Sequence, residues 1–239
     1  MVIADNYNLG NFPAAAPTAH KFVIFPKTLT NSTPMSARKT YLFILVLVEW
    51  FSLSAQMVLH LQASPAATPE ALLRFFTFFT ILTNLLVAVY ATNQLLAPDK
   101  NPTGFFSRPS VQTAITLYIV IVGLVYNIVL RQRWPSSGLQ AVLHDLLHTV
   151  TPLMVLIYWW KWVDTRRLTF SNIPAWLIYP AVYAIIVILR GHFAGWYPYF
   201  FLEVPTLGYP RVFINTALLV GVFLLFSFAF VFFGKRKPV

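Results

Sequence analysis

Two histidines and an aspartate lie within the apolar stretch 141–160. His144, Asp145 and His148 stand between leucines and valines, and a Thr-Val-Thr-Pro run follows. An ionisable group at membrane depth costs about 3 kcal/mol, so such groups usually serve a function. These residue types can bind a metal, move protons, fix helix packing or activate a nucleophile.

The composition predicts a membrane protein rather than a soluble domain. Of 239 residues, 58% are hydrophobic and only 10% are charged. A hydrocarbon core of about 30 Å needs roughly 20 helical residues, which each of six apolar runs nearly supplies. We therefore expect an all-α, six-transmembrane-helix bundle over 38–237, with spans near 41–60, 72–92, 111–130, 141–160, 174–190 and 211–233.

The net charge of +10 is a topology signal and not a nucleic-acid signal. Basic residues collect before the first span, between the second and third, after the fourth and after the sixth. By the positive-inside rule both termini are then cytoplasmic. The sequence thus predicts an integral membrane protein with lipid neighbours and no nucleic-acid partner.

The N-terminal segment and the cysteine content add two limits. Residues 1–37 are rich in Asn, Pro, Ala and Thr, so we expect a disordered or interfacial tail. Met35 before Ser-Ala-Arg-Lys and a span is an alternative first residue. The chain has no cysteine, which excludes disulfides and thiolate ligands.

Polar residues recur at helical spacing within two further spans. Arg74, Thr77, Thr80 and Asn84 are three, three and four residues apart, so they share one face of a continuous helix. In the first span Glu49, Ser52, Gln56 and His60 are three, four and four residues apart and likewise share one face. Hydrocarbon offers these groups no partner, so we expect both faces to point into the bundle.

The fourth span brings His144 and His148 onto one face with Thr151 and sets Asp145 about a quarter turn away. Pro152 removes the hydrogen bond to the His148 carbonyl, and Thr149 or Thr151 can satisfy it. We expect a bend there that shapes a cavity.

A depth estimate links the second and fourth spans. Thr68 and Pro69 form a helix start, and Ser136 or Ser137 can cap the fourth span. Counting about 1.5 Å per residue puts Thr80 and His148 at similar depths, roughly 17–18 Å. If the two spans are neighbours, a hydroxyl–imidazole contact is possible.

Further candidates lie toward the outer side, at the ends of the fifth and sixth spans. They are Arg190, His192, Glu203 and Asn215. The aromatic connection 191–210 between these spans should lie in the interface or fold back over the bundle.

Three motifs resemble a group of six-span bacterial membrane proteins that is distantly similar to the eukaryotic androgen-induced-protein family. They are Arg-Phe-Phe-Thr-Phe-Phe-Thr-Ile-Leu-Thr-Asn-Leu (74–85), His-Asp-Leu-Leu-His-Thr-Val-Thr-Pro-Leu (144–153) and Trp-Tyr-Pro-Tyr-Phe-Phe-Leu-Glu-Val (196–204). The resemblance covers roughly 40–234. It implies a bacterial inner membrane protein without a cofactor.

The eukaryotic members of that family are threonine hydrolases of fatty acid esters of hydroxy fatty acids. The resemblance implies Thr80 as nucleophile, with Thr77 as its rival, and His148 as base. A histidine titrates in the useful range and can take the hydroxyl proton.

Neighbouring polar groups would support such a reaction. Asp145 is placed to tune the site electrostatically. His144, Asn84 or His192 can donate to the oxyanion, and Arg190 or Arg74 can hold a fatty acid carboxylate.

Two alternatives remain open. His144 and His148 are four residues apart, as in zinc hydrolases, and Glu49, His60, His192 or Glu203 can complete a zinc site. A proton-coupled carrier or lipid-binding protein would use the buried Glu49, Asp145 and histidines equally well.

Overall fold

The computed structural model describes residues 35–64, 68–98 and 103–237. They form an all-helical bundle with six helical segments long and apolar enough to cross a membrane, as predicted. The tail expected over 1–37 lies outside the described residues except for its last three. The six segments are α1 (Ala37–Ala63), α3 (Phe79–Leu96), α4 with the π-helical turn η2 (Pro109–Leu130), α5 to α6 (Gly138–Trp162), η4 with α7 (Phe170–Ala194), and α8 (Val204–Gly234).

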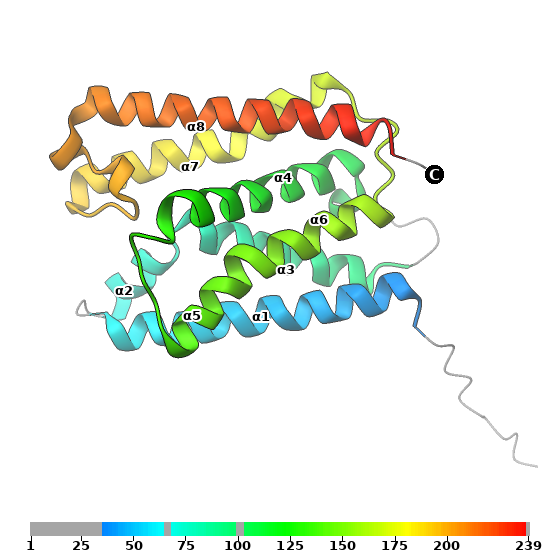
Figure 1. Cartoon of the computed structure of the whole chain (residues 1–239), viewed down its shortest axis with the longest axis horizontal. Helices are drawn as coiled ribbons and strands as arrows, with labels where there is room; N and C mark the ends of the chain where they lie inside the picture. The colour runs from blue at the N-terminus through cyan, green and yellow to red at the C-terminus, as the bar shows by residue number, and fades with distance from the viewer. Residues whose placement is uncertain (1–34, 65–67, 99–102, 238–239) are drawn as a thin grey trace, which may run out of the picture. The chain divides into compact units, whose positions relative to one another are not determined.

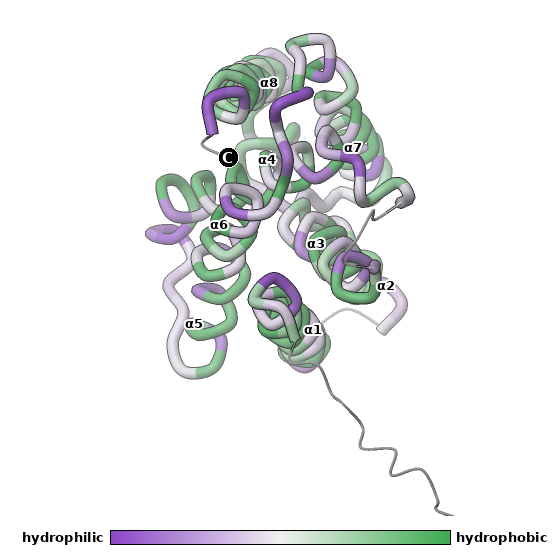
Figure 2. Tube along the Cα trace, turned by 90° about the vertical axis from the view of Figure 1, so that its right-hand side faces the viewer, coloured by the Kyte–Doolittle hydropathy of each residue, from purple (hydrophilic) through white to green (hydrophobic). Residues whose placement is uncertain are grey.

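Successive segments run in opposite directions, so residue 35 and the C-terminus lie at one end of the bundle (Figure 1). Seen end-on, α4 lies among the other helices, with α8 and α7 on one side and α1 on the other (Figure 2). In the most apolar stretch of the α4 segment about 67% is buried within the bundle, against 17–44% in the other five segments. This helix is therefore the centre of the hydrophobic core.

A polar network ties the helices together at the end where the described chain begins. The Arg38 guanidinium donates to the Tyr158 hydroxyl (3.0 Å) and to Gln94 Oε1 (2.9 Å). At the same end Lys237 Nζ donates to the carbonyls of Trp159 (2.5 Å) and Val163 (2.9 Å). Burial lowers the Lys237 pKa to about 8, which Asp164 partly opposes. Basic residues from both chain ends thus hold the bundle at one level.

The expected second span is two helices and not one. The short α2 (Thr68–Phe75) ends before Phe76, and Phe78 has an extended backbone (φ −74°, ψ 127°) before α3 begins. Phe75 and Phe78 both pack against the His60 ring, and Phe78 also packs edge-on against Tyr199. The extended backbone at Phe78 interrupts the helical run between α2 and α3. The predicted continuous face from Arg74 to Asn84, and the depth count based on it, are therefore wrong.

The aromatic connection between the last two spans folds back over the bundle. This is one of the two arrangements expected for residues 191–210. Tyr199 and the short helix η5 (Phe200–Leu202) lead directly into α8, which is kinked where Gly208 has φ +73°. Tyr199 and Leu202 are buried in one hydrophobic cluster with Tyr126. This contact brings a loop residue to the wall of the candidate site.

Candidate functional site

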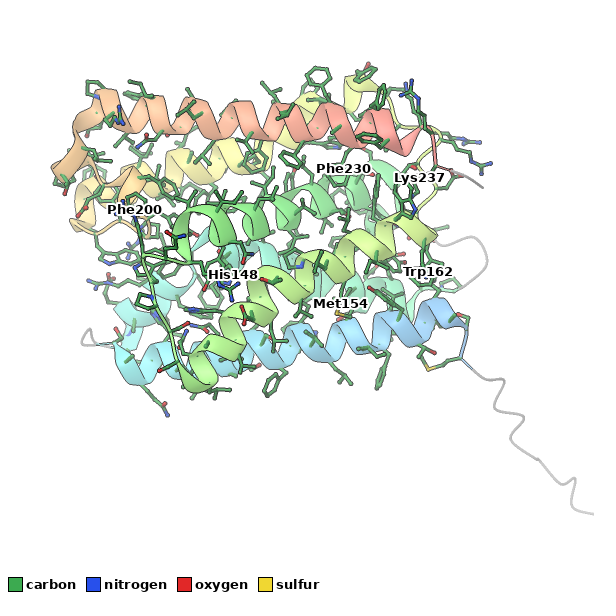
Figure 3. All side chains as sticks on the ribbon, in the orientation of Figure 1. His148, Met154, Trp162, Phe200, Phe230 and Lys237 are labelled. Atoms are coloured by element: carbon green, nitrogen blue, oxygen red, sulfur yellow. The ribbon has the colours of Figure 1, made fainter. Side chains whose placement is uncertain are left out.

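His148 lies in the interior between α4 and α6 (Figure 3). Its ring is stacked on the Tyr126 ring, with centroids 3.8 Å apart and planes 18° apart, and only 8% of the residue is exposed. His148 Nδ1 is 2.8 Å from the His144 carbonyl oxygen. A carbonyl only accepts, so Nδ1 carries the proton and the neutral ring keeps its lone pair on Nε2. That nitrogen has no hydrogen-bond partner within the described part of the chain and can act as a base.

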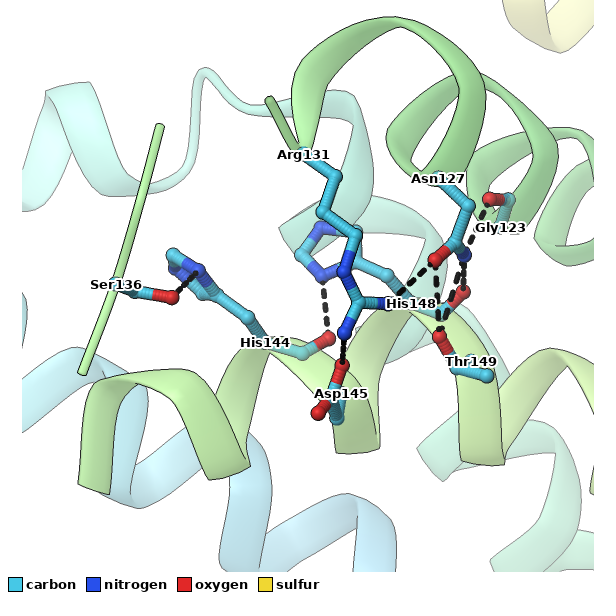
Figure 4. A network of polar contacts seen from close by, with 8 residues as sticks. All are labelled: Gly123, Asn127, Arg131, Ser136, His144, Asp145, His148 and Thr149. Carbon is cyan, nitrogen blue, oxygen red and sulfur yellow. Dashed lines mark hydrogen bonds and ion pairs between the residues drawn. The ribbon is translucent and has the colours of Figure 1, made fainter. Parts of the chain in front are cut away.

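Two π-helical turns that face each other shape this region. They are η2 (Tyr126–Leu130) and η3 (Leu146–Val150), and such turns often occur at functional sites. Asn127 Nδ2 donates to the Gly123 carbonyl (2.9 Å) and, across the helices, to the His148 carbonyl (3.1 Å) (Figure 4). The His148 carbonyl, which Pro152 leaves without its helical donor, therefore accepts from Asn127. The prediction that Thr149 or Thr151 would satisfy it is wrong. Thr149 Oγ1 instead accepts from the same amide.

His144 is held by polar partners on both ring nitrogens. Gln140 Nε2 lies 2.6 Å from His144 Nε2. Ser136 Oγ lies 3.1 Å from His144 Nδ1, as Figure 4 shows. An amide nitrogen only donates, so His144 Nε2 accepts and Nδ1 donates to the serine. Ser136 thus binds His144 and does not cap the fourth span. His144 would have to give up a partner before it could donate to an oxyanion.

Asp145 forms an ion pair with Arg131 at 2.7 Å, and both side chains are 49% exposed. Arg131 also donates to Asn127 Oδ1 at 2.8 Å. Because Asp145 is engaged at the surface, it does not orient the His148 ring. This agrees with its predicted place to the side of the histidine face.

Thr80 lines a cavity of about 640 Å³ between α3, α4, α7 and α8. The wall is almost wholly apolar and includes Val125, Leu130, Ile188 and Phe223. The Tyr199 hydroxyl also reaches this wall, accepts from the Thr80 N–H (3.4 Å) and lies beside the Thr80 side chain. Burial raises the Tyr199 pKa, so the phenol keeps its proton and can donate it.

The two candidate nucleophiles differ in what their hydroxyls contact. Thr77 Oγ1 donates to the Leu73 carbonyl at 2.6 Å, so its proton is engaged by its own backbone. No bond to its own backbone holds the Thr80 hydroxyl among the residues described. Thr80 lines the cavity, and its side chain is hydrogen-bonded to the Tyr199 phenol. Thr80 is therefore the more available nucleophile.

The anticipated contact between Thr80 and His148 is not present in the described structure. No hydrogen bond joins them, and His148 is not among the residues that line the Thr80 cavity. Tyr126 covers the His148 ring and belongs to the same hydrophobic cluster as Tyr199, but it does not line the Thr80 cavity.

Arg74 and Arg190 share the carboxylate of Glu70. Glu70 Oε1 accepts from Arg74 at 2.9 Å and from Arg190 at 3.0 Å, and both guanidinium groups lie over the Trp196 ring. The hydrogen bond from Arg74 lowers the Glu70 pKa, and the Arg190 charge adds to this effect. The carboxylate that these arginines hold is the protein's own.

The remaining candidates lie in separate contacts. His192 Nδ1 is 3.1 Å from the Tyr209 hydroxyl, and Asn215 donates to the Phe201 carbonyl at 2.9 Å. Glu203 precedes α8 and accepts the Leu207 N–H through its carbonyl. Asn84 donates to the Thr80 carbonyl at 2.8 Å. Of these, Asn84 and Asn215 are hydrogen-bonded to residues of the cavity wall, Thr80 and Phe201.

The residues do not form a zinc site. No group of three or more His, Asp or Glu that could hold a metal exists within the described ranges. The His144 and His148 rings are perpendicular, with centroids 5.7 Å apart, and three of their four nitrogens face protein partners. The zinc alternative therefore finds no support in the geometry.

Sequence reasoning missed Tyr126, Asn127 and Tyr199. Tyr199 stands in the motif 196–204 but was assigned no role, because its approach to Thr80 depends on how the loop folds. Asn127 is a polar residue inside an apolar span, which is a usable signal. Tyr126 gives no signal, since tyrosine in a membrane helix is common.

Comparison of the chain with known protein families, with characterised proteins and with solved structures finds no match. The fold and the site define a class, a six-span integral membrane protein with an apolar cavity and a buried histidine. A function for it is argued from these side chains.

Proposed function

We propose that the protein is an intramembrane hydrolase of lipid-like esters. The observation that carries this proposal is Thr80, which lines an apolar cavity of about 640 Å³ with its side chain beside the Tyr199 phenol. Sites for small molecules typically have this size, apolar walls and a few convergent polar groups. An acyl chain would fill the cavity and bring its ester to the two hydroxyls.

The proposed reaction has two steps, acylation of Thr80 and hydrolysis of the acyl-threonine. Each step forms one bond to the carbonyl carbon of the ester and breaks another. Thr80 Oγ1 attacks the ester carbonyl carbon, and its proton passes to His148 Nε2. The alcohol leaves with that proton, and water then hydrolyses the acyl-threonine to release the carboxylic acid. The Tyr199 hydroxyl donates to the oxyanion, a contribution of about 100-fold in rate for one such donor.

The role of His148 rests on its fixed tautomer. With Nδ1 hydrogen-bonded to the His144 carbonyl, the lone pair on Nε2 is available. Proton transfer to this atom requires a bridging water or a turn of the Tyr126 ring when substrate binds. Catalytic hydrogen bonds often form only in the substrate complex.

We place the protein in a bacterial inner membrane with both termini cytoplasmic. The basic side chains of Arg38 and Lys237 at one end of the bundle support this orientation. Because the chain has no cysteine, single substitutions Ser36→Cys and Ser137→Cys are clean probes. An impermeant maleimide should label intact cells at Ser137→Cys only, and labelling of Ser36→Cys alone would reverse the orientation.

The test of the activity is turnover of long-chain 4-methylumbelliferyl esters and of branched fatty acid esters by purified protein. We expect Thr80→Val and His148→Gln to abolish turnover and Tyr199→Phe to lower it about 100-fold. Thr77→Val is the matched control and should keep at least half of the activity. Full turnover by Thr80→Val would refute the proposal.

A second candidate function is lipid binding without chemistry. The nearly uniform apolar wall of the cavity favours it, because binding needs no base. Retention of a long-chain ester in a one-to-one complex with no product would support this reading against hydrolysis.

A further inference from the structure

A carboxyl group without a partner lies in the middle of α1. Glu49 has no exposed surface, and both of its carboxylate oxygens lack a hydrogen-bond partner. No Lys, Arg or His from the residues described here forms an ion pair with it or influences its charge. A bare carboxylate in an apolar interior is very costly, so a positively charged species must neutralise it.

Two further oxygens at this level are also without partners. Asn84 Oδ1 and Thr151 Oγ1 are fully buried and make no hydrogen bond. Arg38 contacts Gln94 across antiparallel α1 and α3, so Glu49, eleven residues later, lies level with Asn84, ten residues earlier in α3. The Thr151 hydroxyl of α6 lies within reach of the Glu49 carboxyl. Three helices thus place buried oxygens without partners at about one level of the bundle.

The chemistry of these groups is that of acceptors. The Asn84 amide nitrogen is already bonded to the Thr80 carbonyl, which leaves its buried oxygen as an acceptor without a donor. Thr151 differs from six other hydroxyl residues of the bundle. Those that donate to the carbonyl four residues earlier are Ser52, Thr77, Thr92, Thr113, Thr116 and Thr216. Thr151 makes no such bond, so its oxygen stays available as a ligand.

We propose that Glu49, Asn84 and Thr151 form a binding site for one alkali-metal cation within the bundle. Carboxylate, amide carbonyl and hydroxyl oxygens are ligands that hard cations prefer. A single carboxylate cancels a single positive charge, so a monovalent ion leaves the apolar interior neutral whereas a divalent ion does not. The nearby Ser52 and Thr83 hydroxyls are bonded elsewhere and supply no charge.

Sodium is the probe for this site. The full chain, purified in detergent in choline chloride, is melted after replacement of choline by sodium or potassium at constant ionic strength. A ligand that binds the folded state raises the melting temperature, by about 5 °C near 100-fold saturation. We expect such a rise with sodium, and calorimetric titration with sodium chloride should give one site per chain.

Variants separate this site from general salt effects. Glu49→Gln should remove the sodium response, and Thr151→Val should raise the half-saturating sodium concentration at least tenfold. Glu203→Gln is the matched control, because it removes a carboxylate outside the site, and it should respond as the native chain does. If Glu49→Gln does not fold, the titrations of the native chain and Thr151→Val still decide the matter.

Two results would overturn the proposal. One is equal melting in sodium, potassium and choline, with an infrared band of a protonated carboxyl that Glu49→Gln removes, which would assign the neutralising charge to a proton. The other is a sodium response that survives Glu49→Gln. Ester turnover is not needed for either readout, so the outcome is independent of the proposed hydrolase activity.

Discussion

The Tyr126 ring covers one face of the His148 imidazole at a centroid distance of 3.8 Å. Each residue belongs to a π-helical turn, η2 for Tyr126 and η3 for His148. The extra residue in each turn alters the direction of the side chains and lets the two rings meet. The sequence pattern singles out His148, but it does not single out Tyr126, the residue that covers its ring.

Removal of this ring should expose His148. We expect Tyr126→Ala to raise the rate of His148 modification by diethyl pyrocarbonate several-fold, as followed by peptide mass spectrometry. Tyr126→Phe keeps the stacked ring and is the control, with an unchanged rate expected. Equal rates in both variants would mean that Tyr126 does not limit access.

The crossing of α4 and α6 should depend on the absence of a side chain at Gly123. A Cβ there would lie 2.9 Å from the His148 carbonyl oxygen and 3.0 Å from Pro152 Cγ. Overpacking of this kind costs about 2 kcal/mol, so Gly123→Ala should melt several degrees lower. Gly221→Ala is the control, because nothing lies within 4 Å of its Cβ position. A melting temperature for Gly123→Ala at or above the native value would contradict the close approach.

The Asp145–Arg131 pair should matter little to stability. Both side chains are half exposed, and exposed ion pairs contribute about 0–1 kcal/mol. Asp145→Asn should therefore shift the melting temperature by less than about 3 °C. It should also keep most ester turnover, since Asp145 does not contact the His148 ring. Loss of turnover on this change would give Asp145 a direct part in the site.

The Glu70 carboxylate should make stability depend on pH in the acid range. Its pKa in the folded protein is lowered, first by the Arg74 hydrogen bond. Its contribution is therefore fully present above the ordinary value of 4.5 and is lost as the pH falls through the folded pKa. Between pH 6 and about pH 3.5 the native chain should lose more melting temperature than Glu70→Gln. Parallel curves for the two proteins would show that the carboxylate is not held by the arginines.

The sequence predicts the six spans, but it does not predict the break between α2 and α3 or the contacts between helices. Six apolar runs of sufficient length define the spans, because length and hydropathy suffice in a bilayer. The break between α2 and α3 involves no Pro or Gly, so only tertiary packing of Phe75 and Phe78 reveals it. Likewise Pro152 predicts a freed carbonyl at His148, but its partner Asn127 comes from another helix.

The candidate site, like the fold, could be predicted from the sequence only in part. His148 is indicated by its burial in an apolar span, and its partners within the helix follow from spacing. Contacts between helices decide the rest. Thr80 faces a cavity with Tyr199, whereas the predicted Thr80–His148 contact required a neighbour relation that no pattern within one span encodes.

The most direct test of the central proposal is the position of an acyl group trapped on the protein. Purified chain would be incubated with p-nitrophenyl palmitate, quenched in acid and mapped by peptide mass spectrometry. We predict a palmitoyl adduct on Thr80 that is absent in Thr80→Val and strongly reduced in His148→Gln. An adduct on Thr77, or equal acylation of Thr80 with and without His148, would contradict the account.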